Sequence, residues 1–195
     1  MLSVKQIHYF AKEALDVYTE FEPMIPRTHP IGKVMYNSLA LGYYGIVDYN
    51  SALKYYNEAF NLSGTSTIQM IVLINMAIIH FDRGDAETAL NYLHDARELS
   101  AKMNSSVTDY NILTRINFQI SRIYKLENNL EKAIFFAEEN LQLQLNTVSP
   151  TLADIVNSYV WIADLCPDKI EMCYEKLAIF CSNIYCRLIL KFVII

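Results

Sequence analysis

Glycine, proline and charge are all scarce in this chain of 195 residues. Glycine and proline occur five times each, and charged residues make up only 19% of the chain. Few sharp turns are therefore expected, which favours long helices over the many short strands of a β-sandwich. The same scarcity excludes collagen and low-complexity polymers. Apolar residues are abundant at 53%, and we expect part of this apolar surface to face a partner.

Positive charge and paired cysteines are missing as well. The formal net charge is −5, which argues against a nucleic-acid surface, because such a surface needs many lysines and arginines to neutralise phosphates. The cysteines, Cys166, Cys173, Cys181 and Cys186, are confined to the C-terminal end and form no disulfide framework. They also lack the C-x-x-C pair typical of zinc sites, so we expect no metal and no cofactor.

The N-terminal stretch shows no targeting signal. It contains no long apolar segment and it carries several acidic residues, which fits neither a secretion signal nor a transit peptide. The apolar C-terminal stretch is interrupted by Arg187 and Lys191 and is short for a membrane span. We therefore expect a cytoplasmic chain that does not contact a membrane.

An internal repeat is the strongest positive feature of the sequence. Residues 39–59 align with residues 76–96 at a constant offset of 37, which matches Ala52 with Ala89. A third copy follows after a further 44 residues, with Ala133 in the corresponding place, and a degraded fourth copy starts near Asn157. Because a single unit cannot bury its own apolar side, the repeat predicts a stack of neighbouring units.

Each copy has the pattern of two amphipathic helices joined by a tight turn. Apolar residues at three-and-four spacing mark one face of each helix; in the first copy these are Tyr36, Leu39, Ala40 and Tyr43. A short polar residue stands at the turn of the first three copies: Asp48, Asp85 and Asn129. Such a side chain accepts hydrogen bonds from the free N–H groups at a helix start. In the fourth copy, Pro167 is expected at the first helical position, and Ser149 with Pro150 is expected to open the preceding helix.

The pattern resembles the tetratricopeptide repeat (TPR). The first copy reads Ala40…Tyr43…Ala52-x3-Tyr56-x2-Ala59, which is the family's small residue, aromatic residue, turn and Ala-x3-bulky-x2-Ala. The resemblance is strong in the first two copies. It weakens in the third, where Ala137 and Asn140 replace the bulky residue and the alanine, and the closing proline is absent throughout. More loosely, the chain is similar to the TPR-like sensor domains of peptide-responsive regulators from Gram-positive bacteria and their phages.

This resemblance implies an all-α fold, a right-handed TPR-like superhelix of three to four helical hairpins with an extra N-terminal helix. The expected organisation is an N-terminal helix and proline-containing loop over residues 1–30, the repeat array over 31–177, and an apolar tail over 178–195. The tail is expected to pack back on the array or to form a homodimer contact, or else it marks a chain shortened relative to a longer parent.

For function, the resemblance implies a non-catalytic scaffold that binds a peptide or a partner protein on the concave face. The alternatives are the sensor module of a transcription regulator that lacks its DNA-binding domain, and an enzyme of unknown type, which no catalytic motif supports. The predicted peptide-binding residues are Asn37, Tyr44, Asn75, Phe81, Arg115, Phe118, Gln119, Arg122 and Lys125. Counting the same face along the fourth copy adds Leu152, Ile155, Tyr159 and Ile162. The competing interpretation is that Ile74, Ile78 and Phe118 are core and that the basic residues are a solvated face.

Overall fold

The computed structural model describes residues 13, 16, 17, 19–24, 32–63, 67–102, 110–147 and 151–193, with only the backbone given for residues 22 and 183–193. Over these residues the fold is all-α, as predicted, and contains no strand. Its elements in chain order are η1 (Glu22–Met24), α2 (Gly32–Gly45), α3 (Tyr49–Ser63), α4 (Thr67–Asp82), α5 (Ala86–Lys102), α6 (Tyr110–Leu126), α7 (Leu130–Leu145), α8 (Leu152–Leu165), η2 (Pro167–Lys169) and α9 (Ile170–Val193).

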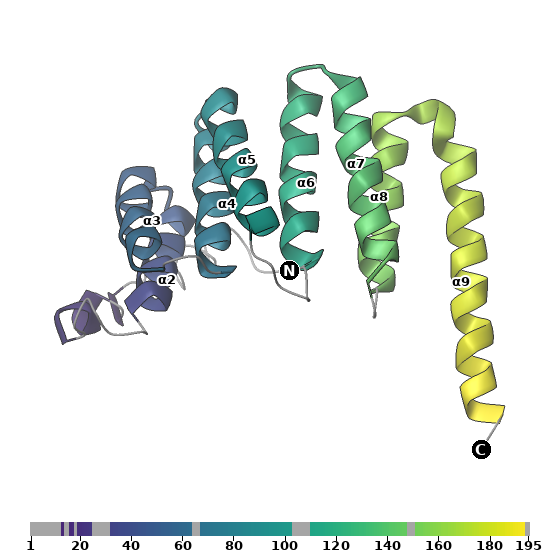
Figure 1. The fold of residues 1–195 in the computed structure, drawn as a ribbon, viewed down its shortest axis with the longest axis horizontal. Coiled ribbons are helices and arrows are strands. Elements are labelled where there is room, and N and C mark those ends of the chain that lie inside the picture. Colours follow the sequence, from purple (N-terminus) through teal and green to yellow (C-terminus); the bar gives the residue numbers. More distant parts are fainter. Residues whose placement is uncertain are drawn as a thin grey trace. The chain divides into compact units, whose positions relative to one another are not determined.

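The helices pair into hairpins within two compact units (Figure 1). The N-terminal unit, Met1–Thr108, contains the hairpins α2/α3 and α4/α5, and the C-terminal unit, Asp109–Ile195, contains α6/α7 and α8/α9. The N-terminal helix and loop predicted over residues 1–30 lie largely outside the described residues. Helix α9 continues without a break past residue 178, where the sequence suggested the start of a separate tail.

The turn inside each of the first three hairpins is built in the same way. The backbone N–H of Asp48 donates to the carbonyl of Tyr43 at 3.0 Å, and Asp85 and Asn129 make the equivalent bond at 2.9 Å. The side chains of these three residues then accept the backbone N–H three positions later in the next helix. One residue therefore closes the first helix and caps the second, and the capping role predicted from the sequence is confirmed.

The residue before each cap adopts a left-handed backbone conformation. The φ angles are 65° at Val47, 82° at Gly84 and 59° at Asn128. Glycine and asparagine tolerate this region, whereas a β-branched residue is strained there. The left-handed position is thus repeated in three hairpins. Only the first hairpin places a β-branched residue, Val47, in it.

This difference gives a reciprocal stability prediction. Val47→Asn is expected to raise the free energy of unfolding by about 1 kcal/mol, because it relieves the left-handed strain at an exposed site. Gly84→Val is expected to lower it by a similar amount, about 1 kcal/mol. A Cβ atom at Gly84 would meet no atom within 4 Å, so this cost comes from the backbone alone. Urea denaturation measures both, and a destabilised Val47→Asn variant would refute the strain.

The capping carboxylates make stability depend on pH. Hydrogen bonds from Ser51 hold the pKa of Asp48 below its usual 3.8, and bonds from Thr88 lower the pKa of Asp85 in the same way. The unfolded state therefore binds protons first as the pH falls below about 4, and stability is lost in that range. We expect Asp48→Asn to flatten this decline, measured as the unfolding midpoint in urea between pH 7 and pH 3. An unchanged pH profile would contradict the capping role of the charge.

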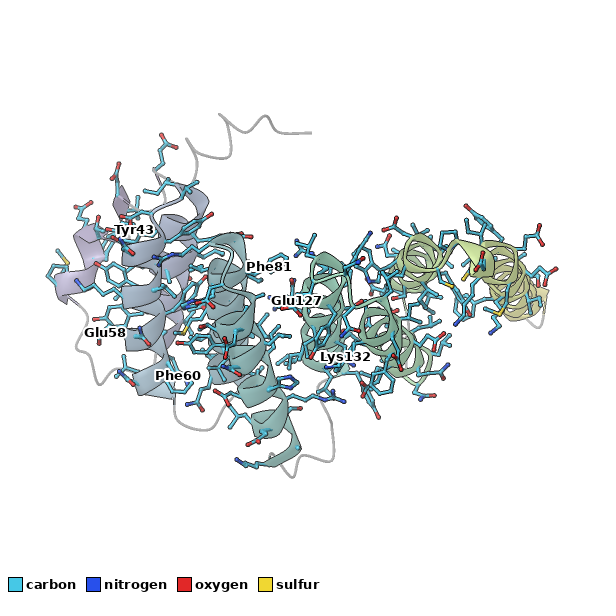
Figure 2. All side chains as sticks on the ribbon, turned by 90° about the horizontal axis from the view of Figure 1, so that it is seen from above. Tyr43, Glu58, Phe60, Phe81, Glu127 and Lys132 are labelled. Atoms are coloured by element: carbon cyan, nitrogen blue, oxygen red, sulfur yellow. The ribbon has the colours of Figure 1, made fainter. Side chains whose placement is uncertain are left out.

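Small residues let the paired helices approach each other. Ala52, Ala89 and Ala133 are all 0% exposed, at equivalent places in the first turns of α3, α5 and α7. The neighbouring space is filled by ring pairs at equivalent positions: Tyr43 with Tyr55 at 5.2 Å, His80 with Tyr92 at 5.3 Å, and Tyr124 with Phe136 at 5.9 Å (Figure 2 labels Tyr43). The alanines predicted to mark close helix contacts are therefore buried.

The fourth hairpin corrects one expectation about its caps. Helix α8 begins at Leu152 with Thr151 as its N-cap, so Ser149 and Pro150 do not open the helix. Thr151 accepts the backbone N–H of Asp154 and donates its hydroxyl to the Asp154 carboxylate, a reciprocal arrangement that fixes the start of the helix. Pro167 does occupy the first position of η2, as predicted.

Candidate functional site

The nine predicted peptide-binding residues divide between the two units. Asn37, Tyr44, Asn75 and Phe81 lie on α2 and α4 of the N-terminal unit and are all half-buried. The other five lie on α6 of the C-terminal unit. Each group is described within its own unit.

In the N-terminal unit, a hydrogen bond joins α2 and α4, which are the first helices of its two hairpins. The Tyr44 hydroxyl donates to Oδ2 of Asp82 at 2.8 Å, and the Tyr44 ring lies 6.0 Å from Tyr49. Oδ1 of Asn37 is buried and has no hydrogen-bond partner among the described residues. The sequence did not anticipate that Tyr44 would be tied to Asp82, because residues 38 positions apart share no local pattern. Its phenol is therefore held in place between α2 and α4.

In the C-terminal unit, side chains from α6 and α8 alternate in a ladder. The guanidinium of Arg122 lies 6.0 Å from the centre of the Phe118 ring, and Phe118 meets the edge of Trp161 at 5.4 Å. The ammonium of Lys125 lies 4.7 Å from the centre of the Trp161 ring and pairs with Asp164. We call Phe118, Arg122, Lys125, Trp161 and Asp164 the α6/α8 ladder. Phe118 is 36% exposed, so the ladder belongs to the surface.

A buried serine anchors this ladder. Ser121 is 0% exposed; its hydroxyl donates to the carbonyl of Ala133 at 2.7 Å and accepts from Nε1 of Trp161 at 2.8 Å. It therefore connects α6, α7 and α8. Gln119 accepts a hydrogen bond from Arg122 at 2.9 Å, which orients the guanidinium. The aromatic and cationic groups are consequently fixed before any ligand arrives.

The cationic part of the surface is narrower than the sequence suggested. Lys125 is neutralised by Asp164, whereas Arg115 is exposed two helical turns before Arg122. Of the three basic residues predicted on this face, Lys125 is therefore held in an ion pair. Trp161 and Asp164 were not among the residues predicted for this surface, although Trp161 follows Tyr124 by the repeat offset of 37.

The competing interpretation, that apolar residues of the predicted face belong to the core, is right for Ile74 and wrong for Phe118. Ile74 is 0% exposed and belongs to the core, whereas Phe118 is exposed. In α8, Ile155, Tyr159 and Ile162 are buried in a core cluster with α7, which corrects their placement on the binding face. Leu152 is exposed, and α8 also contributes Trp161 and Asp164 to the α6/α8 ladder.

Equivalent surface positions differ in chemistry between the units. The offsets of 37 and 44 relate Val34 to Ile71 and Arg115, and relate Leu41 to Ile78 and Arg122. Val34 is 47% exposed and Leu41 is 54% exposed. The first-helix face is thus apolar in the N-terminal unit and basic in the C-terminal unit.

Other features of the described residues offer less chemistry. Their His, Cys, Asp and Glu side chains form no group of three able to hold a metal ion. Burial raises the pKa of the Cys173 thiol, which keeps it protonated and unreactive. A cavity of about 210 Å³ is lined by Phe60, Gln69, Leu73, Asp95, Glu98, Leu99 and Lys102, and its Glu98 and Lys102 pair with each other at 3.2 Å. In the part of the chain that the structure describes, no helix is both long and apolar enough to span a bilayer.

Comparison with solved structures shows a TPR-like helical repeat fold. The crystal structure of BtubC (BKLC) from P. vanneervenii matches with a TM-score of 0.73 and 17% sequence identity, over 93% of this chain and 81% of that chain. A kinesin light chain from Podosopora anserina with nearly identical TPR-like repeats matches with a TM-score of 0.66 and 13% identity, over 92% of this chain and 89% of that one. At these identities the likeness shows the fold alone.

Curated relatives match shorter parts of the sequence. Heat shock protein STI1 of Saccharomyces cerevisiae is 27% identical over 99 residues, which are 51% of this chain and 16% of STI1. Photosystem I assembly protein Ycf3 of Synechococcus elongatus is 30% identical over 66 residues, which are 34% of this chain and 38% of Ycf3. The chain thus spans well under two thirds of these relatives. No family model matches it.

Proposed function

We propose that the chain is a non-catalytic, TPR-type scaffold that binds a peptide, or a peptide segment of a partner protein, on its first-helix face. The observation that carries this proposal is the α6/α8 ladder, where aromatic rings and arginine stand at the surface in fixed positions. Rigid aromatic and arginine side chains are the groups that dominate binding energy at protein interfaces. In a helical repeat array, the first helices line the concave side.

The surface chemistry specifies a ligand with two kinds of group. Apolar side chains of the ligand pack on Phe118, which is exposed. One acidic side chain or a C-terminal carboxylate pairs with Arg115 and Arg122, because a guanidinium matches a carboxylate in geometry and charge. We further propose that Gln119 hydrogen-bonds the ligand backbone.

The relatives support a scaffold in general terms. Ycf3 is named for photosystem I assembly and STI1 for the heat-shock response, and we extend only the assembly role, binding of a partner, to this chain. We also propose a cytoplasmic location. The narrower role as the sensor part of a peptide-responsive regulator stays a prediction that rests on sequence resemblance.

The basic surface gives a direct binding test. Arg122→Glu is expected to weaken the binding of an acidic peptide by about tenfold or more. A charge-assisted hydrogen bond is lost, and electrostatic repulsion replaces it. The melting temperature should change little, since Arg122 is only half-buried and its hydrogen bond to Gln119 lies within one helix. Trp161 is the only tryptophan in the chain, so its fluorescence reports binding at the ladder directly.

The probes are short apolar peptides that carry glutamate or a free C-terminus, with glutamine-containing and amidated versions for comparison. Lys132→Glu provides the control with the same change of charge, because Lys132 (labelled in Figure 2) is an exposed cation on α7 and its ammonium lies over the Tyr124 ring, outside the ladder. We expect Lys132→Glu to keep the wild-type affinity. Equal affinities for all three proteins would remove the arginines from the site, and the absence of any bound peptide would refute the proposed function.

A further inference from the structure

The cavity of about 210 Å³ lies in the N-terminal unit, where the end of α3 and the last turns of α5 meet the beginning of α4. Phe60 of α3, which Figure 2 labels, forms one side of it. Leu73 of α4 lies at a second side, and α5 contributes residues between Asp95 and Lys102. The cavity is therefore at the opposite end of the α4/α5 hairpin from the turn that Asp85 caps.

The second copy of the repeat leaves open a space that the first copy fills. The offset of 37 relates Leu73 to Tyr36. Tyr36 is 3% exposed, and its ring stacks on that of Tyr55 with the ring centres 6.0 Å apart. Leu73 has no ring at this position and lines the cavity instead. The hairpin therefore accommodates a larger residue here, and the open space follows from the sequence of the second copy.

The cavity has an apolar wall and an acidic wall. Leu73 is buried, and Phe60 and Leu99 are half-buried, so these three side chains form an apolar surface. Asp95 and Glu98 stand three positions apart on α5, which makes them neighbours on one face of the helix. Such a combination suits a side chain that carries a charged head on an apolar stem.

The acidic wall retains negative charge. Glu98 pairs with Lys102 at 3.2 Å, but these side chains are 72% and 71% exposed, so the contact contributes little. Asp95 has no hydrogen bond or ion pair among the described residues. Two carboxylates and one ammonium leave the lining with a net charge of −1. The cavity is therefore complementary to a cation.

The volume of the cavity limits the occupant to one side chain. Sites for whole small molecules measure about 300–1,000 Å³, which is more than the space available here. Among cationic side chains, arginine has the planar guanidinium that stacks on an aromatic ring such as Phe60. It also presents five N–H donors, enough for two neighbouring carboxylates. Lysine instead offers a more strongly hydrated point charge.

From these features we propose that the cavity is a second binding site, which receives an arginine side chain of a partner protein. The arginine stem packs on Leu73 and Leu99, and the guanidinium lies against Phe60 and pairs with Asp95. Arginine is among the residues that dominate binding energy at interfaces. The site is separate from the first-helix face, because residues two positions apart on a helix, such as Leu73 and Asn75, point to nearly opposite sides.

An NMR titration of the full chain, labelled with ¹⁵N, tests the proposal. The probe is a glycine–arginine–glycine peptide with blocked ends, which should cause saturable shifts at the backbone amides between Asp95 and Lys102. The same peptide with citrulline, which keeps the shape and lacks the charge, should bind about tenfold more weakly or worse, because charge-assisted hydrogen bonds are lost. No saturable shift in this part of α5, or equal affinity for the two peptides, overturns the proposal.

A pair of charge variants locates the binding on the acidic wall. Asp95→Asn keeps the shape of the side chain and should weaken the arginine peptide by about tenfold. Glu87→Gln removes the same charge from an exposed position of the same helix, about 12 Å away, and should keep the wild-type affinity. If the two variants bound the arginine peptide equally, Asp95 would not be its partner and the proposal would fail.

Leu73→Tyr tests whether the arginine enters the cavity. The substitution restores the residue of the first copy, and the added ring should occupy the space, so the saturable shifts in α5 should disappear. Circular dichroism checks that the variant is folded. Leu99→Phe, at the half-buried side of the cavity, is the second variant with the same expected result. Wild-type affinity in a folded variant of either kind would place the arginine outside the cavity and overturn the proposal.

Discussion

Ala89→Leu is expected to destabilise the N-terminal unit by about 1–3 kcal/mol, because overpacking a close helix contact forces neighbouring side chains and backbone to shift. Ala89 is 0% exposed and lies one turn after the cap Asp85, where α5 begins to pack on α4. The alanine is repeated in α3 and α7, which indicates that the hairpin geometry, rather than a local accident, requires a small side chain there. Urea denaturation followed by circular dichroism measures the effect.

The matched control is Ala101→Leu, the same substitution at an exposed position of the same helix. Leucine and alanine differ little in helix propensity, so the control isolates the packing cost. We expect Ala101→Leu to leave the unfolding midpoint almost unchanged. Equal stabilities of the two variants would mean that α4 and α5 are not held at the short separation that the hairpin requires.

Ser121→Ala is expected to lower the free energy of unfolding by about 1–3 kcal/mol. The substitution deprives Nε1 of Trp161 of its acceptor and breaks the bond to the carbonyl of Ala133. Three helices lose a shared connection, and the indole is free to move away from Phe118. The fluorescence of Trp161 should therefore shift in the folded protein, which separates this effect from a general loss of stability.

Ser182→Ala serves as the control for this prediction. Ser182 is exposed and its hydroxyl donates to the carbonyl of Ile179 within the same helix. Its removal should affect neither the midpoint nor the emission of Trp161. If Ser121→Ala matched Ser182→Ala in both measurements, the serine would not anchor the ladder.

The hairpins were predictable because their signals are local. Asp48, Asp85 and Asn129 stand directly at the turns they cap, and the buried alanines recur at fixed offsets from them. Glycine at position 84 and asparagine at position 128 are the residue types that adopt a left-handed backbone, so their conformation agrees with their chemistry. Val47 gives no sign of a left-handed backbone in its own side chain, and the geometry follows from the turn that the neighbouring residues form.

The ladder was only half predictable. Phe118, Arg122 and Lys125 share one face of a single helix, so spacing alone brings them together. Trp161 and Asp164 join them from α8, and this contact depends on how two hairpins pack. The sequence suggested a free cationic triplet because the pairing of Lys125 with Asp164 spans 39 residues and follows no helical period.

The most direct test of the central claim, that the first-helix face binds the ligand, is hydrogen–deuterium exchange of the chain with and without a peptide that shifts Trp161 fluorescence. We predict slower exchange in α6 and α8, at Tyr110–Leu126 and Leu152–Leu165, and unchanged exchange in α7. Protection confined to α7, with α6 and α8 unaffected, would contradict the account.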